Sequence, residues 1–327
     1  MGLRSYIIKR IIKSFVLIIF VLTLNFIIFE LMPGDPMQFF VSAGKMKPEM
    51  IEEVKRIYGL EKPPLERYGL YVYNMLTWNF GYSFYTTTPV AQEIAARIPN
   101  TLLLVGLSTA LSIVIGVILG VFAAQKRGGT YDTVSVIASL TTYSLPSFWI
   151  GMILILIFHV YLGWFPGAGA WPREWAVNPP QNILEIITGR MQYLFLPLLT
   201  LTIFSYGGYL LLTRATMLET LTEDYITTAK AKGLSQRAIL FKHALKNASL
   251  PLITNAALAF GYLFTGAIIT EQVFTYPGLG EYLWKGVVFK DFPVIQAMFY
   301  IIALAVIIAN FIADLAYGIV DPRIKYE

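Results

Sequence analysis

The sequence has 327 residues, of which 56% are hydrophobic and only 14% are charged. Soluble domains contain about 45–50% apolar and about 25% charged residues. A chain so poor in charge could not cover its surface in water, which excludes a soluble enzyme and a disordered chain. The net charge of +5 is too small to indicate nucleic-acid binding, and the absence of cysteine excludes disulfides and thiolate metal sites. The composition therefore indicates a membrane protein.

Six long uncharged segments predict six transmembrane helices. A membrane helix needs about 20 apolar residues, because it crosses about 30 Å of hydrocarbon at about 1.5 Å per residue. The third segment is too long for one straight helix, so we expect an interruption near Pro146 and a turn at 163–167. Pro251 is expected to begin the fifth span. The predicted spans are about 14–32, 100–124, 133–162, 193–213, 250–270 and 293–313.

Basic residues predict the orientation of these spans. An even number of spans places both termini on one side, and the short segments of that side carry fourteen lysines and arginines, against four in the opposite short loops. Cytoplasmic loops are enriched in Lys and Arg, so we expect both termini and the loop 214–249 in the cytoplasm. The predicted fold is thus an all-α polytopic membrane protein. The first span is expected to be retained, because the small residues 41–43 lie too far beyond it for a cleavage site.

The predicted organisation is a first span with an extracytoplasmic segment (1–97), a five-span domain (98–318) and a tail (319–327). Within the extracytoplasmic segment, Pro48 and Gly59 are placed to begin and end one helix. A Pro-Pro pair then precedes a second short helix. The apolar positions that would align are Ile51, Val54 and Ile57 in the first helix and Leu65, Tyr68, Tyr71, Val72 and Met75 in the second.

The segment 219–251 contains the most informative local pattern. Thr220 with Glu223 three residues later fits a capping box, and opposite charges at the two ends match the helix dipole. Gly233 is placed to end the helix of about ten residues that starts at Glu223. Ser235 is placed to cap a second helix. We therefore predict a short, separate helix between the fourth and fifth spans.

The sequence DYITTAKAKGL…HALKNASLP, with Ala229, Gly233 and Pro251, resembles the cytoplasmic coupling loop of binding-protein-dependent ABC-importer permeases. It resembles most their dipeptide and oligopeptide branch. The usual Glu-Ala-Ala opening is replaced by Thr-Thr-Ala, and this departure is itself similar to the peptide branch. Other segments resemble the same branch, and their order on this topology makes the resemblance specific. These segments are 32–36, 58–63, 79–83, 271–274, 276–280, 291–294 and 321–323.

This resemblance implies the type I ABC-importer permease fold and a location in the cell membrane. It also implies a second, similar permease, two ATP-binding subunits and an extracytoplasmic binding protein as partners. ATP and magnesium would be held by the ATP-binding subunits, so this chain is expected to be no enzyme and to bind no cofactor or metal. The helix of the coupling loop would insert into a groove of one ATP-binding subunit. The contact residues that it implies are Glu223, Asp224, Tyr225, Thr228, Ala229, Lys232, Gly233 and Leu234.

Two further sets of residues are candidates, and for the pathway set the alternative is ordinary bundle packing. Polar side chains beside helix-breaking positions could line the pathway, and residues after the fifth span could dock the binding protein. For Glu271 the alternative is structural hydrogen bonding. Gly116 and Gly120 of the second span indicate close helix packing, within the chain rather than in a dimer. The pathway candidates are Thr142, Ser144, Tyr206 and Thr265, and the docking candidates are Glu271, Tyr276 and Gly278.

Peptide import is the function that the resemblance favours. Related permeases also carry oligosaccharides or nickel, and the sequence has no Cys/His cluster in favour of nickel. An ion-driven secondary transporter is the alternative from another class, but it would need ionisable groups inside the spans, which are scarce here. A membrane enzyme has no support, because the sequence contains no GxSxG elbow, no cysteine and no histidine pair at helical spacing.

Overall fold

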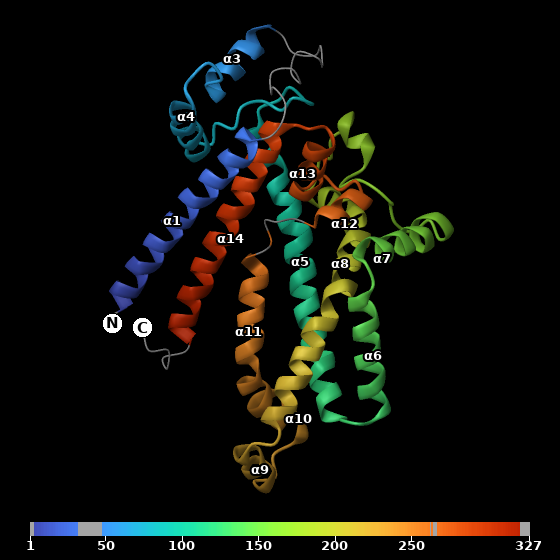
Figure 1. Ribbon diagram of the computed structural model, residues 1–327. Coiled ribbons are helices and arrows are strands. Elements are labelled where there is room, and N and C mark those ends of the chain that lie inside the picture. The colour runs from blue at the N-terminus through green and yellow to red at the C-terminus, as the bar shows by residue number, and fades with distance from the viewer. Residues whose placement is uncertain (1–2, 32–47, 262, 264–266, 321–327) are drawn as a thin grey trace. The chain divides into compact units, whose positions relative to one another are not determined.

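The computed structural model describes residues 3–31, 48–261, 263 and 267–320 of the chain. These residues are mostly helical and contain no strand, only an isolated antiparallel bridge between Tyr82 and Pro89. The all-α prediction is therefore confirmed for the part of the chain that the structure describes. The chain forms two compact units (Figure 1). Unit 1 comprises Met1–Thr101, Phe264–Ile268 and Pro277–Glu327, and unit 2 comprises Leu102–Leu263 and Ile269–Tyr276.

Unit 1 contains two long helices and several short ones. They are α1 (Leu3–Glu30), α3 (Pro48–Tyr58), α4 (Pro64–Leu76), the first part of α5 (Val90–Gln125), α13 (Leu279–Val288) and α14 (Phe292–Val320). Helices α1 and α14 lie side by side, as Figure 1 shows. An apolar core joins them to α4, with Leu22, Met75 and Met298 among its buried side chains. The short helices therefore cover the end of a two-helix pair.

The two helices predicted between residues 48 and 76 are confirmed. Gly59 follows the end of α3 with φ +61°, a left-handed conformation that glycine adopts without strain. Tyr71 and Met75 are buried on α4 as predicted, but Leu65 is 82% exposed, so its place on that face was wrong. At 100° per residue, Leu65 points about 120° away from Tyr71 around the helix. The side chains of Ile51 and Val54 lie outside the described residues.

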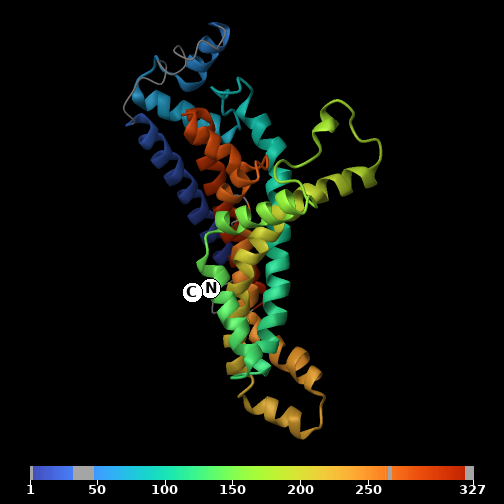
Figure 2. The same ribbon diagram turned by 90° about the vertical axis from the view of Figure 1, so that its right-hand side faces the viewer.

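Unit 2 contains the rest of α5 and a bundle of helices around α8. They are α6 (Thr130–Ser144), α7 (Ser147–Leu154), the π-helical η1 (Ile155–Tyr161), the 3₁₀ turn η2 (Arg173–Ala176), α8 (Ile183–Thr220), α9 (Asp224–Ala231), α10 (Gln236–Ala238), the π-helical η3 (Ile239–Ala244), α11 (Leu245–Gly261) and most of α12 (Ile268–Val273). Figure 2 shows the segment between η1 and α8 looping out from the bundle. Helix α8 contacts α6, α7 and α11 and thus forms the centre of the unit.

Glycines allow α8 to approach its neighbours closely. A Cβ atom added at Gly116 would lie 2.5 Å from Cβ of Tyr209, and one at Gly120 would lie 2.6 Å from Cβ of Thr213. Both positions therefore require glycine where α5 crosses α8. A Cβ at Gly207 of α8 would likewise lie 2.7 Å from the backbone oxygen of Ser139 in α6. The predicted role of the α5 glycines in packing within the chain is confirmed.

The described residues do not confirm the predicted number of six spans. Within the described residues, four helices are long and apolar enough to cross a membrane, and a fifth span is possible if α6 and α7–η1 count as one. Those two are bent by 100° at the break before Ser147, which confirms the predicted interruption near Pro146. Helix α11 has 17 residues up to Gly261 and continues the helical structure of α10 and η3. Residues 262 and 264–266, which follow it, lie outside the described part of the chain.

Several predictions fall outside the described residues. They concern the segments 32–36 and 321–323, most of the tail 319–327, part of the predicted fifth span and the pathway candidate Thr265.

Candidate functional site

The predicted short helix is present as α9, between α8 and α10. In Figure 1 it lies at the tip of unit 2, beyond the turn that joins α5 to α6. Gly233 stops it as predicted, with φ +73° and its N–H donating to the carbonyl of Lys230 at 2.9 Å. The Ser235 Oγ atom accepts a hydrogen bond from the N–H of Ala238 at 3.3 Å, which confirms the predicted cap of the next helix.

The predicted capping box at the start of this helix is wrong. Thr220 is still the last residue of α8, so its hydroxyl donates to the carbonyl of Thr216 at 2.8 Å. Glu223 is the N-cap of α9 and makes no side-chain cap hydrogen bond. Because α8 continues beyond its predicted end at residue 213, Thr220 never adopts the extended backbone that an N-cap needs. The helix is accordingly shorter than predicted, with eight residues.

Pro251 does not begin a helix either, because it lies inside α11. Helical structure continues from α10 through η3 to the end of α11. Ala244, Ala248 and Leu252 are all buried, at the four-residue spacing of one helix face. The burial of this apolar face stabilises the helix by more than the loss of the one backbone hydrogen bond that the proline removes.

Helix α9 has one buried face and one exposed face. Ile226 is fully buried and Ala229 is 5% exposed, and both belong to an apolar cluster with Val121 of α5, Met217 of α8 and Leu240 of η3. This cluster, which we call the anchor cluster, fixes α9 to the ends of three other helices. Ala229 was predicted as a contact residue for a partner, but the structure places it among the chain's own side chains. The other seven predicted contact residues are exposed: Glu223, Asp224, Tyr225, Thr228, Lys232, Gly233 and Leu234.

The two-faced helix α9 is suited to transmit movement rather than to catalyse a reaction. A displacement of α9 acts through the anchor cluster on the ends of α5, α8 and η3 together, because close-packed interiors deform little. The exposed face offers a mixture of polar, charged and apolar side chains to a partner. Among the described residues, no group of three or more His, Cys, Asp or Glu side chains could hold a metal ion.

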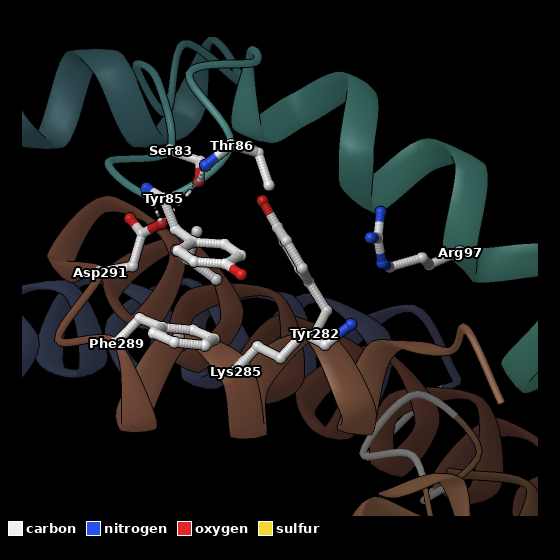
Figure 3. A pocket seen from close by; sticks show the side chains of 10 residues that line it. Ser83, Tyr85, Thr86, Arg97, Tyr282, Lys285, Phe289 and Asp291 are labelled. Atoms are coloured by element: carbon white, nitrogen blue, oxygen red, sulfur yellow. Dashed lines mark hydrogen bonds between the residues drawn. The ribbon is translucent and has the colours of Figure 1, made fainter. Parts of the chain in front are cut away.

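Unit 1 contains a second polar cluster around Asp291, shown in Figure 3. The Asp291 carboxylate accepts hydrogen bonds from Ser83 Oγ at 2.5 Å and from the Tyr85 N–H at 3.2 Å. The ring of Tyr85 stacks on Phe289 at 3.9 Å. Burial raises the pKa of Asp291, and the hydrogen bonds from Ser83 and from backbone N–H groups oppose this rise. Asp291 thereby ties the loop around Ser83 to the start of α14.

A cavity of about 60 Å³ lies beside this cluster, with Arg97, Tyr282 and Lys285 also in its wall. The Arg97 guanidinium lies 4.4 Å from the centroid of the Tyr282 ring, and Arg97 and Lys285 form ion pairs with Glu93 and Glu281. Ligand pockets measure about 300–1,000 Å³, so this cavity has room only for a few water molecules. We interpret it as a structural joint. Sequence reasoning missed it, since Ser83 and Asp291 are 208 positions apart.

The three docking candidates are buried. Glu271 is fully buried, Tyr276 is 2% exposed, and Gly278 is buried at the N-cap of α13. Burial raises the pKa of Tyr276 to about 12. These buried positions present little accessible surface to a partner. Docking stays a prediction for them, as does structural hydrogen bonding, the alternative stated for Glu271.

Of the pathway candidates within the described residues, Ser144 is exposed and Thr142 is half-buried, and both lie on α6. The hydroxyl of Thr142 donates to the carbonyl of Ala138 at 3.1 Å, and that of Ser144 donates to the carbonyl of Leu140 at 2.7 Å. Both are ordinary bonds to the preceding turn of their own helix. Tyr206 is half-buried on α8. A role in the pathway remains a prediction for these residues.

Comparison with known proteins places this geometry in context. Residues 116–326 match the family described as "Binding-protein-dependent transport system inner membrane component", and residues 3–105 match the description of its N-terminal part. The chain is 38% identical over 325 residues to the oligopeptide transport system permease protein AppB of Bacillus subtilis, covering 99% of this chain and 100% of the relative. It is 36% identical over 314 residues to the di/tripeptide transport system permease protein DppB of Pseudomonas aeruginosa, covering 93% and 94%. It is 34% identical over 323 residues to the glutathione transport system permease protein GsiC of Escherichia coli, covering 99% of each chain.

Proposed function

Because this chain belongs to the peptide branch of the binding-protein-dependent ABC-importer permeases, in the inner membrane, we propose that it forms half of a translocation pathway for di- and oligopeptides. A second, similar permease supplies the other half. Two ATP-binding subunits hold ATP and magnesium, and an extracytoplasmic binding protein delivers the peptide. The chain itself then binds no cofactor and hydrolyses no ATP.

The two-faced helix α9 is the observation that carries the coupling part of this proposal. Its outward face is open along the whole helix, while Ile226 and Ala229 are fixed in the anchor cluster. A short helix with this division is suited to lie in a groove of an ATP-binding subunit. The neighbouring Lys230, Lys232 and Arg237 support a cytoplasmic location for this end of unit 2, because cytoplasmic loops are enriched in Lys and Arg.

The energetic requirement on this contact is specific. ATP can drive the pathway between inward-facing and outward-facing states only if the ATP-binding subunits contact the two states differently. Helix α9 meets this requirement when it moves as one body with the ends of α5 and α8, since closure of the ATP-binding pair then changes the packing of the spans.

A reconstituted complex tests the proposal. Tyr225, which is 40% exposed on α9, is replaced in Tyr225→Asp, and Tyr73, which is 65% exposed on α4, receives the same change as a control. Stimulation of ATP hydrolysis by the peptide-loaded binding protein should be lost in Tyr225→Asp and kept in Tyr73→Asp. Equal stimulation in the two assembled variants would refute coupling through α9. If the parent chain assembles with no ATP-binding subunit, the importer assignment itself fails.

A further inference from the structure

Helices α6 and α8 are joined by an ion pair between Asp132 and Arg214. The Nε atom of Arg214 donates to Oδ1 of Asp132 at 2.5 Å, and its Nη2 atom donates to Oδ2 at 2.8 Å. The N–H of Gly128, in the turn between α5 and α6, donates to the same Oδ2 at 2.9 Å. Asp132 is only 3% exposed. One buried carboxylate thus holds together α8, the first turn of α6 and the turn before it.

An ion pair is not needed merely to hold two helices in contact. The Arg214 side chain is 27% exposed, but the Asp132 carboxylate is buried. Taking this carboxylate out of water costs free energy that is recovered only when the geometry is good and its hydrogen bonds are made. Two apolar side chains would join α6 to α8 without that cost. The two parallel bonds of an arginine to a carboxylate add what apolar contact lacks, namely a fixed relative position of the two helices.

The position of the pair connects it to α9. Arg214 lies three residues before Met217, which belongs to the anchor cluster together with Ile226 and Ala229 of α9. At the other end of α6, the chain bends by 100° into α7. Between these points α6 also contacts α8 where the backbone of Ser139 closely approaches Gly207. A displacement of α9 therefore reaches α8 through the anchor cluster and α6 through Arg214.

We propose that the Asp132–Arg214 pair makes α6 follow α8 when α9 is displaced, so that both are positioning residues for coupling. This inference rests on the proposed function, since it names how movement at the same contact reaches the spans. Without the pair, a displacement of α9 still moves α8 but moves α6 less. ATP hydrolysis is then no longer coupled to peptide transport.

The test uses the full complex in nanodiscs with the variants Asp132→Asn and Arg214→Lys. The matched control is Glu30→Gln, because Arg67 and Glu30 form a similar two-bond pair between α4 and α1, with Nη1–Oε1 and Nη2–Oε2 distances of 2.9 Å. We expect basal ATP hydrolysis per assembled complex to stay within about twofold of the parent in all three variants. Stimulation by the loaded binding protein should fall at least about fivefold in the two variants of the α6–α8 pair only.

A distance measurement separates positioning from folding. The chain has no cysteine, so spin labels at Ile137→Cys on α6 and Lys230→Cys on α9 are the only ones it carries. The distance between them should stay constant in the parent between the nucleotide-free and the vanadate-trapped state, and should change in Asp132→Asn. Restored coupling in the swapped double variant Asp132→Arg with Arg214→Asp would support the same conclusion.

Two results would overturn the inference. One is unchanged stimulation in assembled Asp132→Asn, and the other is a label distance that behaves identically in parent and variant. A parent complex that shows no stimulation by the loaded binding protein would instead refute the proposed function, which keeps the two failures distinct.

Discussion

Helix α9 in unit 2 and the Asp291 cluster in unit 1 use polar side chains in opposite ways. On α9 the polar groups face outward, and only Ile226 and Ala229 hold the helix to the chain. Around Asp291 the polar groups face inward, and Oδ2 of the carboxylate accepts hydrogen bonds from Ser83 Oγ and from the Tyr85 N–H. The first arrangement leaves a surface for a partner, and the second holds two distant segments together. The exposure of the polar groups thus distinguishes a surface that is available to a partner from a structural joint within the chain.

The largest expected effect comes from placing the same charge on the two faces of α9. In Ala229→Asp the new carboxylate is buried without a partner in the anchor cluster, which costs on the order of 3–5 kcal/mol of unfolding free energy. In Thr228→Asp the carboxylate is in solvent, and its place near the helix C-terminus costs less than about 1 kcal/mol. Thermal unfolding in detergent measures both.

The two variants should also differ in the step at which they fail. Thr228→Asp is expected to fold and assemble normally but to lose stimulated ATP hydrolysis, since it changes the outward face. Ala229→Asp should fail earlier, at folding or assembly. Equal thermal stabilities for the two variants would contradict the assignment of Ala229 to the buried face.

An intermediate effect is expected from removing one bond of the structural joint. Ser83→Ala deletes the hydroxyl that donates to Asp291 and leaves the buried carboxylate with one donor fewer. A hydrogen bond to a charged group contributes about 1.5–3 kcal/mol, so the unfolding free energy should fall by about 2 kcal/mol. Stimulated ATP hydrolysis per folded complex should remain near that of the parent. A loss of stimulation at full stability would mean that the joint takes part in coupling.

Local chemistry made α9 and its neighbours predictable. Gly233, Ser235 and Pro146 act within a few residues of themselves, and the structure confirms the helix end, the cap and the break that they predict. The capping box at Thr220 failed because α8 extends through a residue that also fits a cap. A local pattern is therefore reliable only when no longer element competes for the same residues.

The ion pair within unit 2 and the hydrogen bond within unit 1 could not be predicted in this way. Arg214 and Asp132 are 82 positions apart, and Ser83 and Asp291 are 208 apart. Sequence reasoning counted Arg214 as a basic residue that indicates orientation, and nothing in its neighbourhood identifies the carboxylate that it meets. The buried face of α9 was unpredictable for a similar reason, since only the positions of α5, α8 and η3 make Ala229 an inward residue.

The smallest expected effect is a change in the pH dependence of stability, and it tests whether Asp291 is buried as a charged group. Burial raises its pKa above the ordinary value of an aspartate in the folded chain, whereas the unfolded chain keeps that ordinary value. Between these two pKa values the folded state binds more protons than the unfolded state. The contribution of Asp291 to stability therefore decreases as the pH rises through that window and is constant above it. Asp291→Asn removes the titrating group, so the difference in unfolding free energy between parent and variant should change with pH only there. A difference that is flat from pH 3.5 to 7, measured by thermal unfolding, would show that the carboxylate is solvated and that the joint is open to water.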